Sequence, residues 1–250
     1  MPAVLANGVR LNVAELGQGP AVVAVHGLLL GNLATWYLGA GSLLAEHRRV
    51  ICYDLRGHGR SERPLSGYSV SAMAADLLGL LDALGLERVD LVGHSYGALI
   101  GLELRLRHPE RVRRLVLVEP PLAPGDLGEI EAFLSRTPEE MLASLPAGLE
   151  LGGRRARRML EGMVALASQT ELLAVLAERA GVPDSSLTSL GRETMIIFGA
   201  ASPCSAQAAR VHALAPGVRV ELLPGGHFLP LEAARPLAAL IGEHLEAADG

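Results

Sequence analysis

The sequence of 250 residues contains no lysine, and all 22 of its basic residues are arginine. Beside abundant alanine and glycine, this bias is typical of a GC-rich genome and carries no functional weight. The 27 acidic residues give a net charge of -5. A mildly acidic chain is a poor candidate for binding nucleic acid through its overall field, so we expect no nucleic-acid partner.

Long hydrophobic runs are also lacking. The longest apolar stretch, residues 21–30, is interrupted by His26 and falls short of the roughly 20 residues that cross a bilayer. The first 19 residues show no basic start followed by an apolar segment, the pattern of a secretory signal. We therefore expect no membrane partner and a cytoplasmic protein. Since half of the residues are hydrophobic, a disordered chain is excluded.

Cysteine is scarce, with Cys52 in an apolar run and Cys204 in a polar stretch. Two cysteines allow at most one disulfide, and their separation matches no metal-site spacing. The histidines form no H-E-x-x-H motif, and no G-x-G-x-x-G follows a predicted strand. We expect neither a metal nor a cofactor.

The length suits a single domain with an insertion. Asn7-Gly8 predicts a two-residue hairpin turn near the N-terminus. After it, short apolar runs alternate with segments of helical spacing, the pattern of a mostly parallel sheet covered by helices. The predicted buried strands are 21–25, 50–53, 89–92, 115–118, 194–198 and 218–222, and the clearest predicted helices are 72–84 and 231–245.

The alternation fails between residues 120 and 191, where helical patterns follow one another without a strand. The predicted helices there are 127–136, 139–145, 154–167 and 171–180. Ligands of open α/β sheets bind beyond the carboxyl ends of the strands, so an insertion at this point can cover the site. We predict a core of residues 1–119 and 192–250 with a helical cap of residues 120–191.

Gly93-His94-Ser95-Tyr96-Gly97 is the strongest local motif, a G-x-S-x-G that follows a predicted strand and opens a predicted helix. A serine at such a turn is held in a strained backbone conformation that exposes its hydroxyl. The following helix directs its N-terminal amides toward charge that develops near Ser95. The motif indicates a nucleophile; the simpler alternative is a tight turn in which Ser95 only caps the helix.

Two histidine-glycine segments end other predicted strands. The loop after His26-Gly27 emerges at the same sheet edge as Ser95, so the backbone N–H groups of Leu28 and Tyr96 can form an oxyanion hole. Gly225-Gly226-His227 follows the last strand, and a histidine there can reach a serine on a neighbouring strand. We predict His227 as the general base.

These segments together resemble the α/β-hydrolase fold family: His26-Gly27, Asp54 to Ser61, the Ser95 motif and Gly225 to Phe228. The resemblance implies a mostly parallel eight-stranded sheet flanked by helices, with a helical cap. It also implies a serine-acid-histidine triad in that chain order and a two-amide oxyanion hole. The Asp54 to Ser61 stretch is, in this family, a turn that supports the pocket, so Asp54 is an unlikely triad acid.

The position of the acid departs from the family pattern. Most relatives carry an aspartate after the strand that follows the cap, but Ser202 stands there, and residues 194–220 contain no Asp or Glu. A serine hydroxyl can orient an imidazole but cannot neutralise an imidazolium. Glu119 directly follows the preceding strand, and we predict that it is the acid. Asp90 and Asp126 are weaker candidates, and Glu119 capping a helix or pairing with an arginine is the alternative.

The resulting hypothesis is a serine hydrolase that cleaves a carboxylic ester, lactone or thioester through an acyl-enzyme on Ser95. Because aromatics are few at 3%, we expect an aliphatic pocket for a small apolar substrate, with Trp36 and Phe228 at its wall. The run Arg154 to Arg158 is a solvated helix face or a site for an anionic partner. The alternative function is an inactive member of the fold that binds a small apolar ligand. The sequence leaves the oligomeric state open.

Overall fold

The computed structural model describes residues 3–28, 31–127, 132, 136–137, 140 and 154–247. Its centre is an eight-stranded sheet in the order β1-β2-β4-β3-β5-β6-β7-β8. The strands are β1 (Ala3–Ala6), β2 (Val9–Leu16), β3 (Ala21–Val25), β4 (Arg49–Tyr53), β5 (Val89–His94), β6 (Val112–Val118), β7 (Thr194–Gly199) and β8 (Arg219–Leu223).

Only the N-terminal part of this sheet is antiparallel. The hairpin β1-β2 turns at Asn7 and Gly8, both with positive φ, as a primed two-residue turn requires. β2 pairs antiparallel with β4, and every later pairing, from β3-β4 to β7-β8, is parallel. Parallel strands end at one common edge, so the segments after β3, β5, β6, β7 and β8 meet there. The predicted α/β architecture is confirmed.

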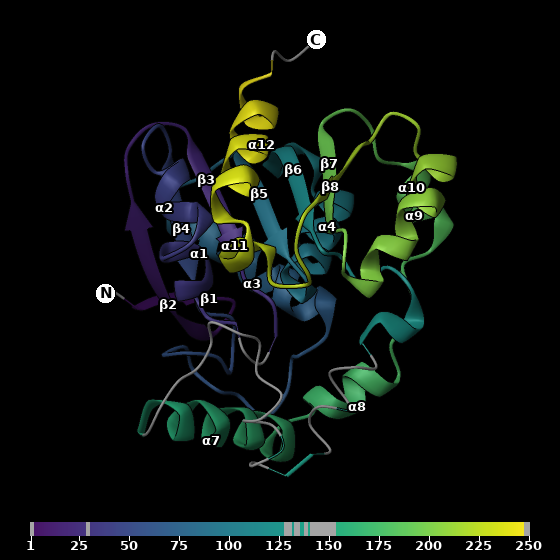
Figure 1. The fold of residues 1–250 in the computed structure, drawn as a ribbon. Coiled ribbons are helices and arrows are strands. Elements are labelled where there is room, and N and C mark those ends of the chain that lie inside the picture. The colour runs from purple at the N-terminus through teal and green to yellow at the C-terminus, as the bar shows by residue number, and fades with distance from the viewer. Residues whose placement is uncertain are drawn as a thin grey trace.

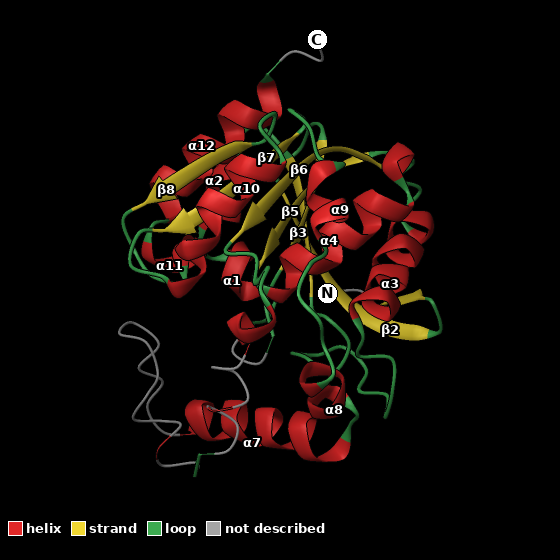
Figure 2. Ribbon diagram, turned by 90° about the vertical axis from the view of Figure 1, so that its right-hand side faces the viewer, coloured by secondary structure: helices red, strands yellow, loops and turns green. Residues whose placement is uncertain are grey.

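Helices cover both faces of the sheet (Figures 1 and 2). The described α-helices are α1 (Ala34–Tyr37), α2 (Ala40–Leu44), α3 (Val70–Ala83), α4 (Tyr96–Arg107), α7 (Arg154–Gln169), α8 (Leu172–Ala177), α9 (Asp184–Thr188), α10 (Ala208–Leu214), α11 (Leu229–Glu232) and α12 (Ala234–Glu246), with 3-10 turns at Pro109–Arg111, Pro124–Leu127 and Pro203–Gln207.

The buried apolar side chains form two layers, one on each face of the sheet. In β3, Val23 and Val25 pack in the layer that contains the buried faces of α3 and α4. Val22 and Ala24 point the other way, into the layer with α1, α2 and α12. This alternation follows from the two-residue side-chain period of a strand and explains why the strand reads as a continuous apolar run.

Between β6 and β7 the described residues contain helices and turns and no strand. α7 and α8 lie beyond the sheet edge at which β5 and β6 end (Figure 1). Most of the predicted helices 127–136 and 139–145 fall outside the described residues, and so does the placement of the Arg154 to Arg158 side chains. The division into a core and a cap of residues 120–191 stays a prediction.

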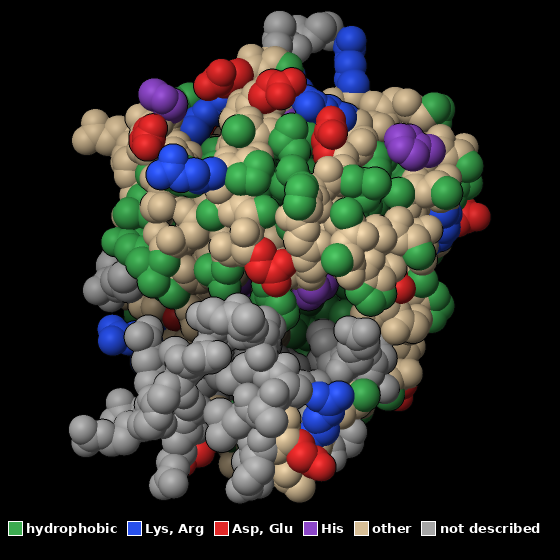
Figure 3. All heavy atoms as spheres, in the orientation of Figure 1, with side chains coloured by type: hydrophobic (Ala, Val, Ile, Leu, Met, Phe, Trp, Pro, Cys, Tyr) green, Lys and Arg blue, Asp and Glu red, His purple; other side chains and the backbone are tan. Residues whose placement is uncertain are grey.

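Charged side chains of both signs are interspersed with hydrophobic ones over the face drawn in Figure 3. Among the described helices, none combines the length and the apolar character that crossing a bilayer demands.

Candidate active site

Ser95 lies at a sharp turn between β5 and α4. Its φ of 55° and ψ of -121° belong to a region that residues other than glycine rarely adopt. Glycine nearby permits this turn, because a Cβ at Gly97 would lie 2.5 Å from the carbonyl oxygens of Val25 and His26. The Ser95 N–H donates to the Val118 carbonyl at 2.9 Å. The turn therefore holds Ser95 at the edge where the parallel strands end.

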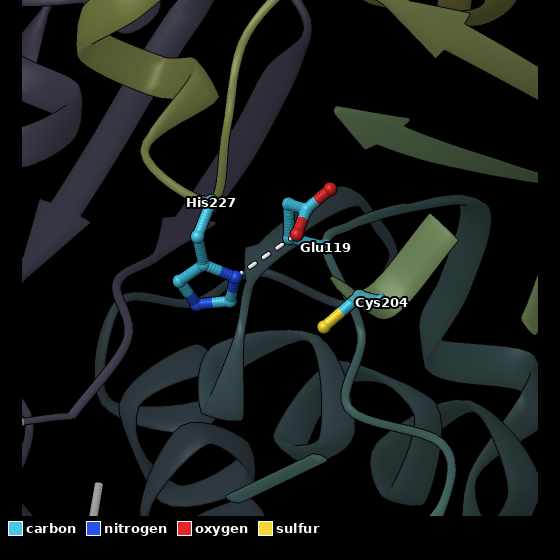
Figure 4. A group of neighbouring side chains, drawn as sticks. All are labelled: Glu119, Cys204 and His227. Atoms are coloured by element: carbon cyan, nitrogen blue, oxygen red, sulfur yellow. Dashed lines mark hydrogen bonds and ion pairs between the residues drawn. The ribbon is translucent and has the colours of Figure 1, made fainter. Parts of the chain in front are cut away.

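His227 follows β8 and reaches Ser95 from the side. Its Nε2 lies 2.9 Å from Ser95 Oγ, and its Nδ1 lies 2.9 Å from Glu119 Oε2; Figure 4 shows the ring directed toward Glu119. An ionised carboxylate can only accept hydrogen bonds, which assigns the ring proton to Nδ1 and leaves the lone pair of Nε2 to accept from the serine hydroxyl. Three residues predicted as a triad thus form one hydrogen-bonded chain.

Glu119 is fully buried, with 0% exposure, at the end of β6. Its φ of 55° places a residue with a side chain in the left-handed region, a strained conformation that clusters at functional sites. Its backbone N–H donates to the Ile197 carbonyl at 2.8 Å. The chain bends here, so the side chain turns toward the His227 ring instead of continuing the strand.

Two further donors satisfy the buried carboxylate of Glu119. The Gly199 N–H donates to Oε1, and the Ser202 hydroxyl donates to Oε2, the oxygen that also accepts from His227. Burial, and then the Glu119 charge, raise the pKa of the Cys204 thiol to about 12, so this neighbouring group stays neutral. Ser202, which stands at the position of the acid in the family pattern, is therefore hydrogen-bonded to Glu119, the predicted acid.

Glu119, Cys204 and His227 place possible metal-ligand atoms within 4.8 Å of one another (Figure 4). The donor set fits a resident metal poorly. Glu119 and His227 already bond each other, and Ser202 donates to the same carboxylate. We therefore treat the cluster as part of the hydrogen-bonded triad.

The other acids considered from the sequence bond elsewhere. Asp54 accepts hydrogen bonds from Leu33 N–H at 2.8 Å and from Asn12 Nδ2 at 2.7 Å, which fixes the loop after β3. Asp90, at the opposite end of β5, pairs with Arg48 and Arg113. Asp126 accepts from the Ala123 N–H at 2.7 Å.

The predicted oxyanion loop lies beside Ser95. A Cβ at Gly27 would be 2.9 Å from the Ser95 Cβ, so the backbone that leads into Leu28 passes close to the nucleophile. His26 shapes this loop, because its Nε2 accepts from the Leu55 N–H at 3.0 Å and its Nδ1–H donates to the Gly27 carbonyl at 2.6 Å. Tyr96 opens α4, where the first N–H groups have no helical acceptor. The oxyanion role of Leu28 and Tyr96 stays a prediction.

The two residues predicted at the pocket wall differ in position. Phe228 is partly exposed, and its ring centroid lies 5.6 Å from that of His227. Trp36 is fully buried instead, and its Nε1 donates to the Val25 carbonyl at 3.0 Å. The structure therefore puts Trp36 in the apolar layer that contains α1, α2 and α12, and its role at the pocket wall stays a prediction.

His94 is a residue to which sequence reasoning assigned no role. Its Nε2–H donates to the His227 backbone carbonyl at 2.7 Å. The two residues stand 133 positions apart in the chain, and only the fold brings them together. The place of His94 inside the G-x-S-x-G motif was the one available signal.

The comparisons with known proteins identify the fold family. A family model described as the alpha/beta hydrolase fold matches residues 20–152. A 2-hydroxy-6-oxo-2,4-heptadienoate hydrolase from Pseudomonas putida is 45% identical over 118 residues, 46% of this chain and 42% of the relative. The matched part thus spans about two fifths of the length of that relative.

Two solved structures extend the likeness over the whole chain. A hydrolase from Pseudomonas aeruginosa is 26% identical with a TM-score of 0.78, covering 96% of each chain. An enol-lactonase from Burkholderia xenovorans is 22% identical with a TM-score of 0.80, covering 98% of this chain and 100% of the other, a likeness of fold alone. With the family model matching more than half of its residues, this chain belongs to the α/β-hydrolase fold family.

Proposed function

We propose that the protein is a serine hydrolase that cleaves an ester-type bond of a small apolar substrate through an acyl-enzyme on Ser95. The observation that carries the proposal is the chain from Ser95 Oγ through the His227 ring to Glu119, with both contacts at 2.9 Å. This is the arrangement that activates a serine hydroxyl at neutral pH.

In the first half of the reaction, Ser95 Oγ forms a bond to the carbonyl carbon while its proton passes to His227 Nε2. The negative charge moves to the carbonyl oxygen, next to the Leu28 and Tyr96 amides. When the tetrahedral intermediate collapses, the bond to the leaving group breaks and His227 returns the proton to that group. Glu119 stabilises the positive ring in between.

In the second half, a water molecule replaces the alcohol, thiol or ring oxygen that has left. His227 takes a proton from the water as it attacks the acyl carbon, and then returns it to Ser95 Oγ as the acid is released. The reaction consumes one water per bond cleaved and needs no cofactor.

A fluorophosphonate probe tests the nucleophile directly. We expect a mass increase of one probe per chain on Ser95, and none in Ser95→Ala. In an ester, lactone and thioester panel, Ser95→Ala should lower kcat for the best substrate by a factor on the order of 10⁴ to 10⁶. If the wild-type protein stays unlabelled and turns over nothing in the panel, the alternative applies, a member of the fold that only binds an apolar ligand.

Arg179 favours a second candidate, hydrolysis of a carbon-carbon bond in a substrate that carries a carboxylate. Its Nη2 donates to the Pro121 carbonyl at 2.9 Å, while its Nη1 is buried with no partner among the described residues. Burial lowers the pKa of Arg179, whereas interactions with Tyr96 and Asp126 raise it. The buried Nη1 of Arg179 can donate to a carboxylate of a substrate. The Pseudomonas putida relative is named for a heptadienoate, which carries such a carboxylate.

The two candidates differ in how they respond to Arg179→Leu. For a carboxylate-bearing substrate, we expect KM to rise by about 10- to 100-fold with loss of the charged pair. For a neutral ester of similar size, KM should stay within about twofold. An equal effect on both substrates would remove the argument for an anionic substrate.

A further inference from the structure

His94 connects the nucleophile turn to the loop that carries the general base. It is the residue before Ser95, its side chain is 3% exposed, and its Nε2–H donates to the backbone carbonyl of His227 at 2.7 Å. The two imidazole rings are tilted by 46° relative to each other, with centroids 5.1 Å apart. This contact belongs to neither the triad chain nor the oxyanion hole.

The tautomer of His94 follows from its acceptor. A backbone carbonyl can only accept, so the ring proton is on Nε2. The other nitrogen, Nδ1, is buried with no partner among the residues that the structure describes, and it faces the backbone of Gly27. Burial, and then the charge of His227, lower the pKa of His94 to about 3. The ring is neutral at every pH at which a hydrolase of this kind works, and it adds no repulsion to a protonated His227.

The loop of the base is held at several atoms. The Ala201 N–H donates to the Gly225 carbonyl at 3.0 Å, and Glu232 accepts from the Gly226 N–H at 2.6 Å. At His227 itself, Glu119 fixes the ring at Nδ1 and His94 fixes the backbone at the carbonyl. The hydrogen bond at Nδ1 fixes only one point of the His227 ring. The backbone of His227 must also be fixed to define where Nε2 lies.

We propose that His94 is a positioning residue that fixes the backbone of His227 relative to Ser95. The inference rests on the proposed function for its kinetic consequence, but the contact itself is independent of catalysis. Because His94 and Ser95 are adjacent in the chain, a single rigid turn sets both the nucleophile and the anchor of the base. Misplacement of reacting groups by about 1 Å costs about a hundredfold in rate.

Three substitutions separate the hydrogen bond from the packing of the ring. In His94→Gln, the amide nitrogen falls near the position of Nε2 and can still donate to the His227 carbonyl. In His94→Asn, a donor remains but falls near the position of Nδ1. In His94→Met, the volume is kept and the donor is lost. A role in packing alone would rank these variants by volume, whereas the proposal ranks them by the position of the donor.

We expect His94→Asn and His94→Met to lower kcat and the rate constant of fluorophosphonate labelling by about 10- to 100-fold, with KM within about twofold. His94→Gln should stay within about threefold of wild type. Equal rates in all three variants would overturn the proposal, and so would a His94→Gln variant as slow as His94→Met while both remain folded.

A second readout does not depend on activity. With ¹⁵N-labelled histidine, the Nδ1–H resonance of His227 should stay sharp in wild type and His94→Gln, and should broaden or shift in His94→Asn and His94→Met. Unchanged His227 resonances in every variant would overturn the proposal. If His94→Asn and His94→Met show these resonance changes but the wild-type protein is not labelled at Ser95, the proposed function fails and the positioning contact stands.

Discussion

Glu119 combines three features at the scale of a single residue: full burial, a positive φ and a carboxylate that accepts hydrogen bonds from His227, Ser202 and Gly199. A buried charge is tolerated only where hydrogen bonds and opposite charge surround it. The segment 199–204, which lacks the usual acid, supplies two of these donors. Ser202, at the position where the family pattern has an acid, therefore supports Glu119, the acid that we propose.

Replacing Ser202 tests this support. A hydrogen bond to a charged group contributes about 1.5–3 kcal/mol. Because Ser202→Ala removes such a bond from Glu119, we expect it to lower kcat by about 10- to 100-fold. Ser205→Ala is the matched control, because the Ser205 hydroxyl donates to the Ser202 carbonyl at 2.7 Å and touches no triad member. Activity assays of both variants check this. A Ser202→Ala enzyme as fast as the control would show that Glu119 is held without the hydroxyl.

Sequence reasoning found the members of this site but not how they support one another. Ser95, His227 and Glu119 each follow a strand, and strand ends can be predicted from apolar runs. The bonds of Ser202 and His94 depend on side-chain orientations across 83 and 133 residues of chain, for which no local pattern exists. For a related reason the position of Trp36 after β3 was predictable, but the direction of its fully buried side chain was not.

At the scale of elements, the turn between β5 and α4 determines the geometry of the nucleophile. α4 can approach β3 so closely only because Gly97 has no side chain; an added Cβ would meet the carbonyl oxygens of Val25 and His26 at 2.5 Å. Backbone atoms cannot move aside as a flexible side chain can. The close packing of α4 against β3 therefore requires glycine in the G-x-S-x-G motif, in addition to the chemistry of the serine. This is why the motif could be recognised in the sequence.

Gly97→Ala should destabilise the fold by about 3 kcal/mol or more, as strained close contacts in a core do. The control is Gly242→Ala in α12, where nothing lies within 4 Å of the added Cβ; it should stabilise the protein by about 0.5–1 kcal/mol, since alanine favours a helix over glycine. Urea unfolding of both variants measures the difference. Similar stability of the two would mean that α4 does not need the close approach.

At the scale of the whole molecule, stability should depend on neutral buried histidines. Burial lowers the pKa of His26, lowers that of His58 to about 4, and lowers that of His94 to about 3. Because the unfolded chain binds protons at its ordinary histidine pKa of about 6.5 and the folded chain does not, acid favours unfolding. The stabilisation is complete above pH 6.5 and is lost as the pH falls toward 4.

We expect Tm to fall steadily between pH 6.5 and pH 4.5. His58→Gln should flatten the slope, because one group that titrates only in the unfolded chain is removed. Thermal unfolding followed by circular dichroism at several pH values checks this. A Tm that is constant over that range in wild type would contradict the assignment of these rings as buried and neutral.

The α/β architecture of the whole chain was predictable from the alternation of apolar runs and helical spacing, because a parallel sheet needs strands buried on both faces. The boundaries shifted by a few residues, as in the helix predicted at 72–84 and found as α3 at Val70–Ala83, where the Ser69 side chain caps the first turn. The placement of α7 and α8 relative to the sheet could not be predicted, because amphipathic helical patterns fix neither the direction nor the partner of a helix.

The central claim is that Glu119 is the acid of the triad, and kcat of Glu119→Gln measured against wild type and Ser202→Ala tests it most directly. Glutamine keeps the shape of the side chain and removes its charge, so the protonated His227 ring loses its counter-charge. The account predicts a fall in kcat of about 10⁴, well beyond that of Ser202→Ala. A folded Glu119→Gln enzyme within tenfold of wild type would contradict it.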